Sequence, residues 1–334
     1  MKIDPPRIAV LALLTAPLGI SVATAAPLPP DPVAVWTLQD ENAAISTAKV
    51  TDRYYTNGLR LSYASGADAM PAPLNELATK LWGDGQRRFT IDVTQQIYTP
   101  FDTASKVPAK GDRPYAGLLM GTFGVMSDTE GHRSFFTAGF GVLGPAALGE
   151  GMQNGFHDLI GQRGNNGWAT QLRNEAVAQI TSSRVYRVRL GKIGNLETDM
   201  LPELTAGLGT VRTYVETGVS FRLGQGLEAD YGVARVRPGP SGGDVFRRIG
   251  DFGWYVFAGI DGQAVARDIT LDGNMFSRSN HVKRTPFIGE AQGGLALLFY
   301  GARLTYTHVV QSEQFRGQKG GLHQFGSLAL SMRF

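Results

Sequence analysis

The sequence predicts an all-β fold, an antiparallel transmembrane β-barrel of about twelve strands with short helices in its loops. Three observations lead to this prediction. The chain begins with an export signal, and no later apolar run approaches the ~20 residues that a membrane-spanning helix needs. Short segments then alternate apolar and polar residues, as strands with one apolar face do. The chain also ends on an aromatic residue, Phe334, that closes such a segment.

Alternation alone also fits a soluble β-sandwich, so the choice depends on what else the segments carry. The polar face carries large charged side chains that suit the polar lumen of a barrel. These are Arg60, Asp92, Arg187, Arg189, Glu216 and Arg222. Aromatic residues gather near segment ends, as they do at membrane interfaces. Examples are Trp36, Tyr54, Tyr55, Tyr98, Tyr115, Tyr300 and Tyr306. Both features favour the barrel.

Residues 1–25 are predicted to be a secretory signal peptide. Two basic residues precede an apolar stretch, and Ala23-Thr24-Ala25 has the small-residue pattern of a cleavage site. The alternative is a membrane anchor, but the apolar stretch is short and is interrupted by a proline and a glycine. Residues 26–334 are then expected to form one outer-membrane barrel domain.

Composition excludes several classes of function. The formal net charge of +3 falls to +2 when the leader, with two bases and one acid, is removed. Without a basic tract, no nucleic-acid partner is expected. The chain has no cysteine, which excludes disulfides and thiol chemistry. Its five histidines are widely spaced and form no His-x-x-x-His metal pattern.

Thirteen segments have the alternation of a strand. They are 33–42, 54–64, 88–98, 114–126, 133–143, 178–191, 200–209, 213–223, 253–261, 263–271, 287–299, 301–311 and 324–334. Bacterial single-chain barrels have an even number of strands, so one segment must be discounted. We discount 263–271 and expect twelve. Two other stretches, 73–82 and 149–162, have helical spacing or composition and are expected to be short helices outside the sheet.

Counting strands from a periplasmic start places five polar clusters at one extracellular rim. They are Glu41-Asn42, Tyr54–Thr56, Tyr98–Pro100, Asp112–Tyr115 and the loop with Gln153 and His157. A channel would instead spread its charges along the lumen, so this gathering favours a surface enzyme. Each cluster also has a plain structural interpretation, such as an ion pair between Asp52 and Arg53 or an exposed loop histidine. In its own strand, Thr56 counts on the polar side with Arg60 and Ser62.

Several ordered motifs carry a resemblance to a known family. They are "ENAAIS" followed by "TDRYYTNGLRLSY", "QQIYTPFD", "GDRPYAG", "GVLGPAALGEGMQNGFHDLIG", "QLRNE", "LDGNMFSRS" and the terminal "FGSLALSMRF". From about residue 35 to its end, the chain resembles the outer-membrane lipid A 3′-O-deacylase family. The resemblance implies a twelve-stranded barrel and calcium-dependent hydrolysis of the ester that holds the 3′ acyloxyacyl group of lipid A.

The resemblance also implies roles for individual residues. His157 would be the general base that activates water, and Gln153, one helical turn earlier, would share its face. Thr56 and Asn42 match positions that shape the site. Ca²⁺ would stabilise the oxyanion, with Asp40, Glu41 and Asn42 as expected ligands.

The sequence departs from the family pattern at one acidic position. The family motif runs Glu-Asn-Asp, whereas this chain reads Glu41-Asn42-Ala43. Asp40 or Glu41 is expected to replace the missing carboxylate in part. A catalytically impaired family member remains an alternative.

Basic and aromatic residues at the same rim are expected to bind the substrate. Arg53, Arg113 and Tyr115, with Lys110 nearby, are assigned to the phosphorylated headgroup, because guanidinium groups bind phosphate well. Ion pairs with Asp52 and Asp112 are the structural alternative.

The expected setting is the outer membrane of a Gram-negative bacterium. The partners would be lipid A of the outer leaflet and the barrel-assembly machinery, and the protein would be a monomer. Three rival functions stay open. They are a passive pore, an outer-membrane phospholipase with an activated serine, and a soluble periplasmic β protein.

Overall fold

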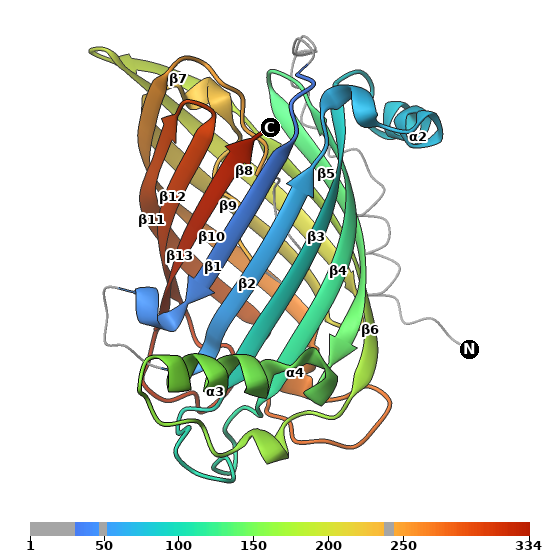
Figure 1. Cartoon of the computed structure of the whole chain (residues 1–334), viewed down its shortest axis with the longest axis vertical. Helices are drawn as coiled ribbons and strands as arrows, with labels where there is room; N and C mark the ends of the chain where they lie inside the picture. The colour runs from blue at the N-terminus through green and yellow to red at the C-terminus, as the bar shows by residue number, and fades with distance from the viewer. Residues whose placement is uncertain (1–30, 47–51, 237–243) are drawn as a thin grey trace.

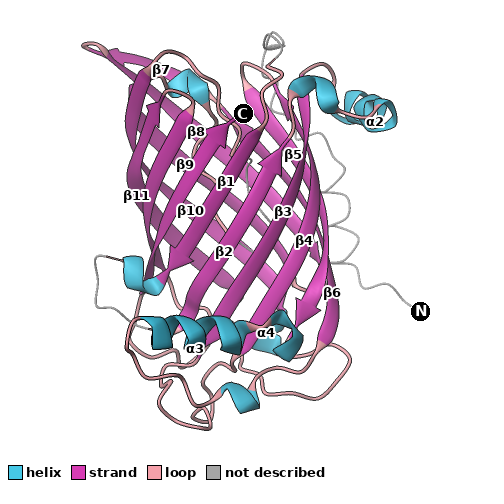
Figure 2. Ribbon diagram, viewed as in Figure 1, coloured by secondary structure: helices cyan, strands magenta, loops and turns pink. Residues whose placement is uncertain are grey.

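The computed structural model describes residues 31–46, 52–236 and 244–334. The expected signal peptide, residues 1–25, lies outside the described residues. The described part is a closed antiparallel β-barrel with helices at both ends (Figures 1 and 2). The N-terminal strand β1 pairs with the C-terminal strand β13, and β6 pairs with β8, so the sheet closes on itself.

Thirteen strand segments make up the wall. They are β1 Val35–Asn42, β2 Tyr54–Ala64, β3 Gln86–Thr99, β4 Ala116–Asp128, β5 His132–Leu143, β6 Glu175–Tyr186, β7 Val188–Ile193, β8 Leu196–Gly209, β9 Arg212–Gln225, β10 Phe252–Asp268, β11 Phe287–Phe299, β12 Ala302–Gln311 and β13 His323–Arg333. β6 and β7 are interrupted only at Arg187 and both pair with β8, so they act as one strand. The barrel therefore has twelve strands, as predicted.

The discounted segment 263–271 is the second half of a long strand rather than a strand of its own. Gly262, where the two predicted segments met, is paired with Thr217 on one side and Gly289 on the other. The inward set of β10 continues through Asp261 and Gln263, which are both buried. The glycine therefore lies within the ladder and does not make a turn.

The described helices are short and lie in the connections between the strands. They are α2 Ala72–Trp82, α3 Gly149–Leu159 and α4 Ile269–Asp272, with single 3₁₀ turns η1 Ala43–Ile45, η2 Ala67–Ala69, η3 Pro145–Ala147, η4 Trp168–Thr170 and η5 Leu227–Ala229. α2 and α3 confirm the two predicted helices and lie at opposite ends of the barrel (Figure 1). Among the described residues, no helix is long and apolar enough to cross a membrane.

The two ends of the barrel differ in their connections. The end that carries α3, called here the α3 end, has long connections such as 100–115 and 144–174. The start of the described barrel and the C-terminal residue meet at the other end, where Ala34 and Phe334 exchange two backbone hydrogen bonds. Outer-membrane barrels carry their longer loops outside the cell. The α3 end is therefore the extracellular one.

The predicted alternation sorts side chains between lipid and lumen. Leu38, Leu61 and Val93 face outward and are 55%, 48% and 51% exposed, as expected for a surface covered by lipid. On the same strands, Arg60 and Asp92 face inward, are fully buried and form an ion pair of 3.2 Å. The polar side of the alternation thus faces the lumen.

Residues 227–236 and 244–247, the described inner parts of the connection between β9 and β10, lie in the lumen. Within this connection, Asp230 is fully buried and accepts ion pairs from Arg222 at 2.6 Å and from Arg303 at 2.8 Å. Asp244 pairs with Arg60 and with Arg303. Removing one partner of a buried pair costs about 3–5 kcal/mol, because a charge is left without compensation. These pairs therefore fix the connection inside the barrel.

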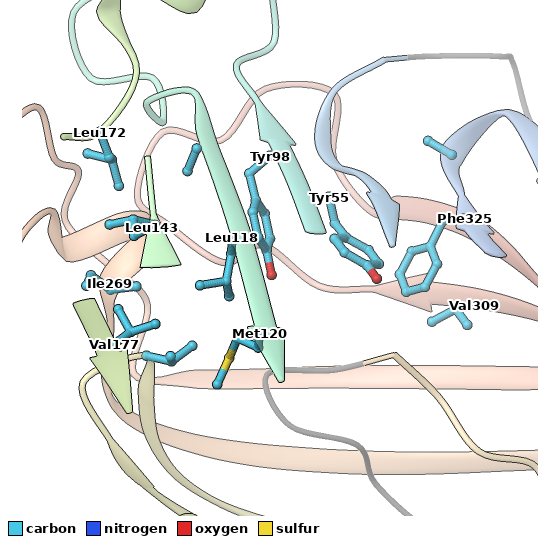
Figure 3. Close-up of a cluster of buried hydrophobic side chains, with 13 residues drawn as sticks. Tyr55, Tyr98, Leu118, Met120, Leu143, Leu172, Val177, Ile269, Val309 and Phe325 are labelled. Carbon is cyan, nitrogen blue, oxygen red and sulfur yellow. The ribbon is translucent and has the colours of Figure 1, made fainter. Parts of the chain in front are cut away.

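A cluster of buried apolar side chains occupies the lumen side of the α3 end. Tyr55, Tyr98 and Phe325 lie close together there, with the Tyr55 ring 5.5 Å from Tyr98 and 5.0 Å from Phe325 (Figure 3). Ala43 belongs to the same cluster and has no exposed surface. Because the strand ends that bear the polar clusters rest on this layer, it fixes their positions.

Candidate functional site

A cavity of about 290 Å³ lies between the wall and α3. Strands β1, β2 and β3 form one side and α3 the other. The lining residues are Asp40, Asn42, Ala44, Asp52, Thr56, Asn57, Leu59, Ile97, Met152, Gln153, Phe156, His157, Ile160 and Gln162. Leu59 belongs to the outward set of β2, with Leu61, so the cavity is on the lipid-facing side of the wall.

The sequence of α3 places its polar and apolar residues on different faces. Gly149, Gln153 and His157 recur every four residues and are the buried residues of the helix. Met152 and Phe156 line the cavity yet are 45% and 52% exposed. The helix therefore turns two polar groups toward the wall and an apolar edge toward the membrane.

A close contact fixes the start of α3 against the wall. A Cβ on Gly149 would lie 3.1 Å from the Cα of Gly117 on β4 and 2.9 Å from the ring of Trp168. Any side chain there would push the helix away from the sheet. The first glycine of "GEGMQNGFHDL" therefore sets the distance between α3 and β4.

His157 is held at both ring nitrogens. Its Nδ1 lies 2.9 Å from the carbonyl oxygen of Arg163, and its Nε2 lies 2.6 Å from Oδ2 of Asp52. The carbonyl can only accept, so Nδ1 donates to it, and Nε2 is the nitrogen that faces the Asp52 carboxylate. His157 is only 5% exposed, so it is held in one orientation.

Gln153 joins the same group. Its Nε2 donates to Oδ2 of Asp52 at 3.4 Å, and its Oε1 accepts from the indole of Trp168 at 2.9 Å. Trp168 is fully buried and packs on Tyr115, with ring centroids 5.0 Å apart. The expected proximity of Gln153 and His157 is present, and Asp52 connects them.

Thr56 reaches the cavity because of a β-bulge, not because of the alternation. The β2–β3 register shifts between Tyr55 and Asn57, so Thr56 is the extra residue. It lines the lipid-facing cavity and shares a 2.7 Å hydrogen bond with Thr99. Its assignment to the side of Arg60 and Ser62 was therefore wrong.

The lumen neighbour of the bulge explains the glycine of the "YTNG" motif. The Tyr55 hydroxyl crosses above Gly58 to bond Glu41 at 2.9 Å, and a Cβ on Gly58 would meet that hydroxyl at 1.9 Å. The polar residues at the start of β2 therefore lie on both faces of the wall. Tyr55 and Gly58 lie on the lumen side, whereas Thr56 and Asn57 line the cavity.

The three expected metal ligands lie on two faces of β1. Asp40 and Asn42 line the cavity. Glu41 faces the lumen, is fully buried, and contacts Arg235 at 3.3 Å and the backbone nitrogen of Val236 at 2.9 Å. Its expected role as a metal ligand is not supported, because adjacent residues of a strand point to opposite faces.

Most of the polar side chains that line the cavity offer oxygen atoms as possible metal ligands. Asp40 accepts a hydrogen bond from Asn57 at 2.6 Å, and Asn42 accepts one from the backbone of Ala44 at 2.7 Å. In the part of the chain that the structure describes, no three His, Asp or Glu side chains form a preassembled metal cluster. Calcium also accepts amide, hydroxyl and water oxygens. The chemistry of these donors therefore fits a calcium ion, with Asp40, Asn42 and Asp52 as its available protein ligands.

Of the expected substrate-binding residues, Arg113 does not reach the cavity. It is fully buried, donates to Gln314 at 3.1 Å and Thr270 at 2.9 Å, and lies 4.5 Å from the centre of the Tyr98 ring. Burial lowers the pKa of its guanidinium. Its expected headgroup role is not supported, because its donors face protein groups inside the barrel.

Arg53 and Tyr115 also lie outside the lining. Arg53 is 5.1 Å from the centre of the Phe101 ring. Tyr115 is buried, which raises the pKa of its hydroxyl, with a further contribution from the Asp102 carboxylate. Tyr115 therefore supports Trp168, which holds Gln153, rather than touching a ligand. Lys110 is exposed in the same loop region.

The ion-pair alternative is wrong for Asp52. Its described partner is His157, not Arg53. The carboxylate of Asp112 accepts from the backbone nitrogens of Phe101 and Arg113 instead of pairing with a side chain. Sequence reasoning thus assigned no site role to Asp52, although it opens the same "DRYYTNG" motif. Trp168 was assigned no role either, because its buried bond to Gln153 joins two segments of the connection that no local pattern relates.

The fold and the cavity define a class, namely outer-membrane β-barrels with a polar site on the lipid-facing wall. Comparison with known proteins then gives the family. The family described as "Outer membrane protein LpxR" matches residues 8–334, and the chain belongs to it. The protein is therefore a protein of the outer membrane.

One solved structure has the same fold, and two others are more distantly similar. The structure titled "LpxR from Salmonella typhimurium" is 19% identical, covers 90% of this chain and 100% of its own, and has a TM-score of 0.75. The β domain of the Bordetella autotransporter BrkA is 10% identical, with coverage of 92% and 100% and a TM-score of 0.44. The translocator domain of NalP from Neisseria meningitidis is 12% identical, with coverage of 98% and 93% and a TM-score of 0.36. No curated protein matches the chain.

Proposed function

We propose that the protein is a lipid A deacylase that hydrolyses the ester of the 3′ acyloxyacyl group. The observation that carries this proposal is a buried histidine in a cavity with an apolar, lipid-facing edge. His157 and Asp52 lie on its inner side, and Met152 and Phe156 are half-exposed at its margin. A lipid ester can enter such a site from the membrane without its acyl chain meeting water.

His157 performs the proton transfers of the reaction. Nε2 takes a proton from a water molecule as the water oxygen attacks the ester carbonyl carbon. The carbonyl π electrons move to oxygen, and the tetrahedral intermediate then breaks its bond to the sugar oxygen. His157 returns the proton to that oxygen, so the products are a sugar hydroxyl and a fatty acid. The Arg163 carbonyl keeps Nδ1 protonated throughout.

Asp52 is a positioning residue in this scheme. In the resting site its Oδ2 lies 2.6 Å from Nε2 of His157, a contact that holds one proton. Asp52 must keep that proton as it turns aside, which leaves Nε2 unprotonated and open to water. Gln153, a donor 3.4 Å from the same oxygen, offers Asp52 a second partner. When water replaces Asp52 at Nε2 of His157, the Asp52 side chain can therefore keep its hydrogen bond from Gln153.

Calcium is part of the proposal. Asp40, Asn42 and Asp52 would hold it, and when bound it would act as a Lewis acid for the negative charge that develops on the ester oxygen. The carboxylate that Ala43 lacks is not needed at position 43 itself, because Ala43 packs in the lumen cluster and does not line the cavity.

Two rival functions receive less support. A passive pore needs an open lumen, but residues 227–236 and 244–247 occupy it with paired arginines and aspartates. A serine-dependent phospholipase needs a serine at the site, and no serine is among the described residues that line the cavity.

The test is mass spectrometry of lipid A from a host that expresses the protein. We expect loss of the 3′ acyloxyacyl mass with wild type, and no loss with His157→Ala or after calcium chelation of isolated outer membranes. Heat-modifiable migration in gels would verify that each variant is folded. Unchanged lipid A with folded wild-type protein and added calcium would contradict the proposal.

A further inference from the structure

A second and larger concavity lies on the outer wall at the α3 end. This groove has a volume of about 900 Å³ and is built on β5, β6, β8, β9 and β10. It shares no lining residue with the cavity under α3. β4 separates the two sites along the wall, because the strand order runs from β3 through β4 to β5.

Apolar residues on neighbouring strands form the floor of the groove. Ala138 on β5 pairs with Ile180 on β6, which pairs with Leu208 on β8, so an apolar row crosses three strands. One step nearer the α3 end, Phe140 pairs with Ala178. Phe140 is 72% exposed and stands beside the groove as an apolar side wall.

The rim of the groove at the α3 end is cationic. Arg284 and Arg267 line it together with Asp272. Arg284 is committed to the protein, since its Nε bonds Asp272 at 3.1 Å and its Nη2 bonds the carbonyl of Ala266 at 2.8 Å.

Arg267 is only partly committed. Its Nη2 donates to the carbonyl of Gly273 at 3.0 Å, while its buried Nε has no hydrogen-bond partner among the described residues. A buried donor without an acceptor is unfavourable. Arg284 and Asp272 neutralise each other. The net positive charge of the rim therefore comes from Arg267, which also has one hydrogen-bond donor without an acceptor.

The order of these groups matches the orientation of a lipid in the outer leaflet. The cationic rim lies at the extracellular end, where headgroups are, and the apolar row lies deeper in the membrane. Guanidinium groups bind phosphate well, and an apolar floor accepts an alkyl chain.

We propose that this groove is a second, non-catalytic lipid-binding site that holds one acyl chain of a phosphorylated outer-leaflet glycolipid, with a phosphate at Arg267. The glycolipid is preferred over a glycerophospholipid because the rim lies on the extracellular side. The inference concerns binding alone and holds whether or not the cavity under α3 hydrolyses an ester.

Native mass spectrometry of the full-length mature barrel can count bound lipids. The background is His157→Ala, which removes turnover, and the probe is diphosphorylated, hexa-acylated lipid A. Ala178→Trp fills the groove, and Arg267→Gln removes the phosphate contact. Arg278→Gln is the matched control, because Arg278 is exposed in the connection that follows β10 and does not line the groove.

We expect the His157→Ala protein to bind one lipid A more than the same protein with Ala178→Trp. Arg267→Gln should weaken this second binding event about tenfold, and Arg278→Gln should leave it unchanged. Removing both phosphates from the lipid should weaken it in the Arg267 protein but not in Arg267→Gln. Ala178→Trp should not reduce deacylation by the otherwise wild-type protein.

Three results would overturn the proposal. They are equal lipid counts with and without Ala178→Trp, equal loss of binding in Arg267→Gln and Arg278→Gln, and tighter filling of the site by phosphatidylglycerol than by lipid A. The two groove variants are independent, so the proposal stays testable if the bulky tryptophan prevents folding.

Discussion

The two faces of the barrel wall differ in how many polar side chains they carry and in how these side chains are paired. In the lumen, charged side chains are numerous and mutually paired, as Asp230 is with Arg222 and Arg303. On the outer face, polar groups gather in the cavity under α3, where Asp40, Asn42 and Thr56 interrupt an apolar surface, and at the rim of the second groove. Polar groups that face lipid are costly, so their presence there indicates function, whereas charges in the lumen mainly stabilise the fold.

Strand β1 shows this difference within three residues. Glu41 is fully buried in the lumen network, while Asp40 and Asn42 on either side face the cavity. Counting acids by their distance in sequence would group all three. Counting them by face separates a structural carboxylate from candidate functional ones.

The comparison predicts its largest effect at His157. His157→Ala should reduce deacylation by roughly 10²–10⁴-fold, because a positioned general base is lost, and should leave unfolding in urea nearly unchanged. Timed mass spectrometry of lipid A in micelles would measure the rate. Strong destabilisation with residual normal activity would place His157 with the structural residues instead.

The next largest effect is expected in the lumen. Asp230→Ala should lower the free energy of unfolding by about 3–5 kcal/mol, because Arg222 and Arg303 lose a buried partner. Urea unfolding in detergent, followed by tryptophan fluorescence, would measure it. The activity of the fraction that remains folded should be near wild type. Loss of activity without loss of stability would show that the charges in the lumen do more than stabilise the fold.

Asp52→Asn should reduce kcat by about 10- to 100-fold, as the loss of a group that orients a catalytic residue typically does. KM should change little, since Asp52 contacts His157 and would help to hold calcium but does not act on the acyl chain. Initial rates at several lipid A concentrations separate the two parameters. A raised KM with unchanged kcat would instead make Asp52 a substrate-binding residue.

A smaller effect is expected at the position where the family motif has an acid. Ala43→Asp should lower the free energy of unfolding by about 1–3 kcal/mol, because it puts a polar group into the buried cluster of Tyr55 and Phe325. It should not raise calcium affinity, as measured by calorimetry. Tighter calcium binding without loss of stability would show that position 43 can reach the cavity.

The smallest effect is expected for an exposed ion pair. Arg248→Gln breaks the pair with Asp251, in which both side chains are more than half exposed. The change in unfolding free energy should be under about 1 kcal/mol, because water screens both charges. Run beside Asp230→Ala in the same urea titration, it serves as the matched control. Equal effects from the two substitutions would show that lumen burial does not strengthen these interactions.

The sequence by itself determined the barrel. Alternation with a period of two is local, so it revealed the strands, and the even-number rule gave twelve although 263–271 proved to be half of β10. Helical spacing revealed α2 and α3, and strand parity brought the five polar clusters to one end. These features depend only on neighbours along the chain.

Only the tertiary structure decided which polar residues meet at the cavity. A single bulge moved Thr56 to the lipid side, which no count along the strand predicts. Arg113 points inward because it donates a hydrogen bond to Gln314, which is far away in sequence. Glu41 points inward because it pairs with the equally distant Arg235. The pairing of Asp52 with His157 likewise joins segments about a hundred residues apart, and local pattern carries no information on such contacts.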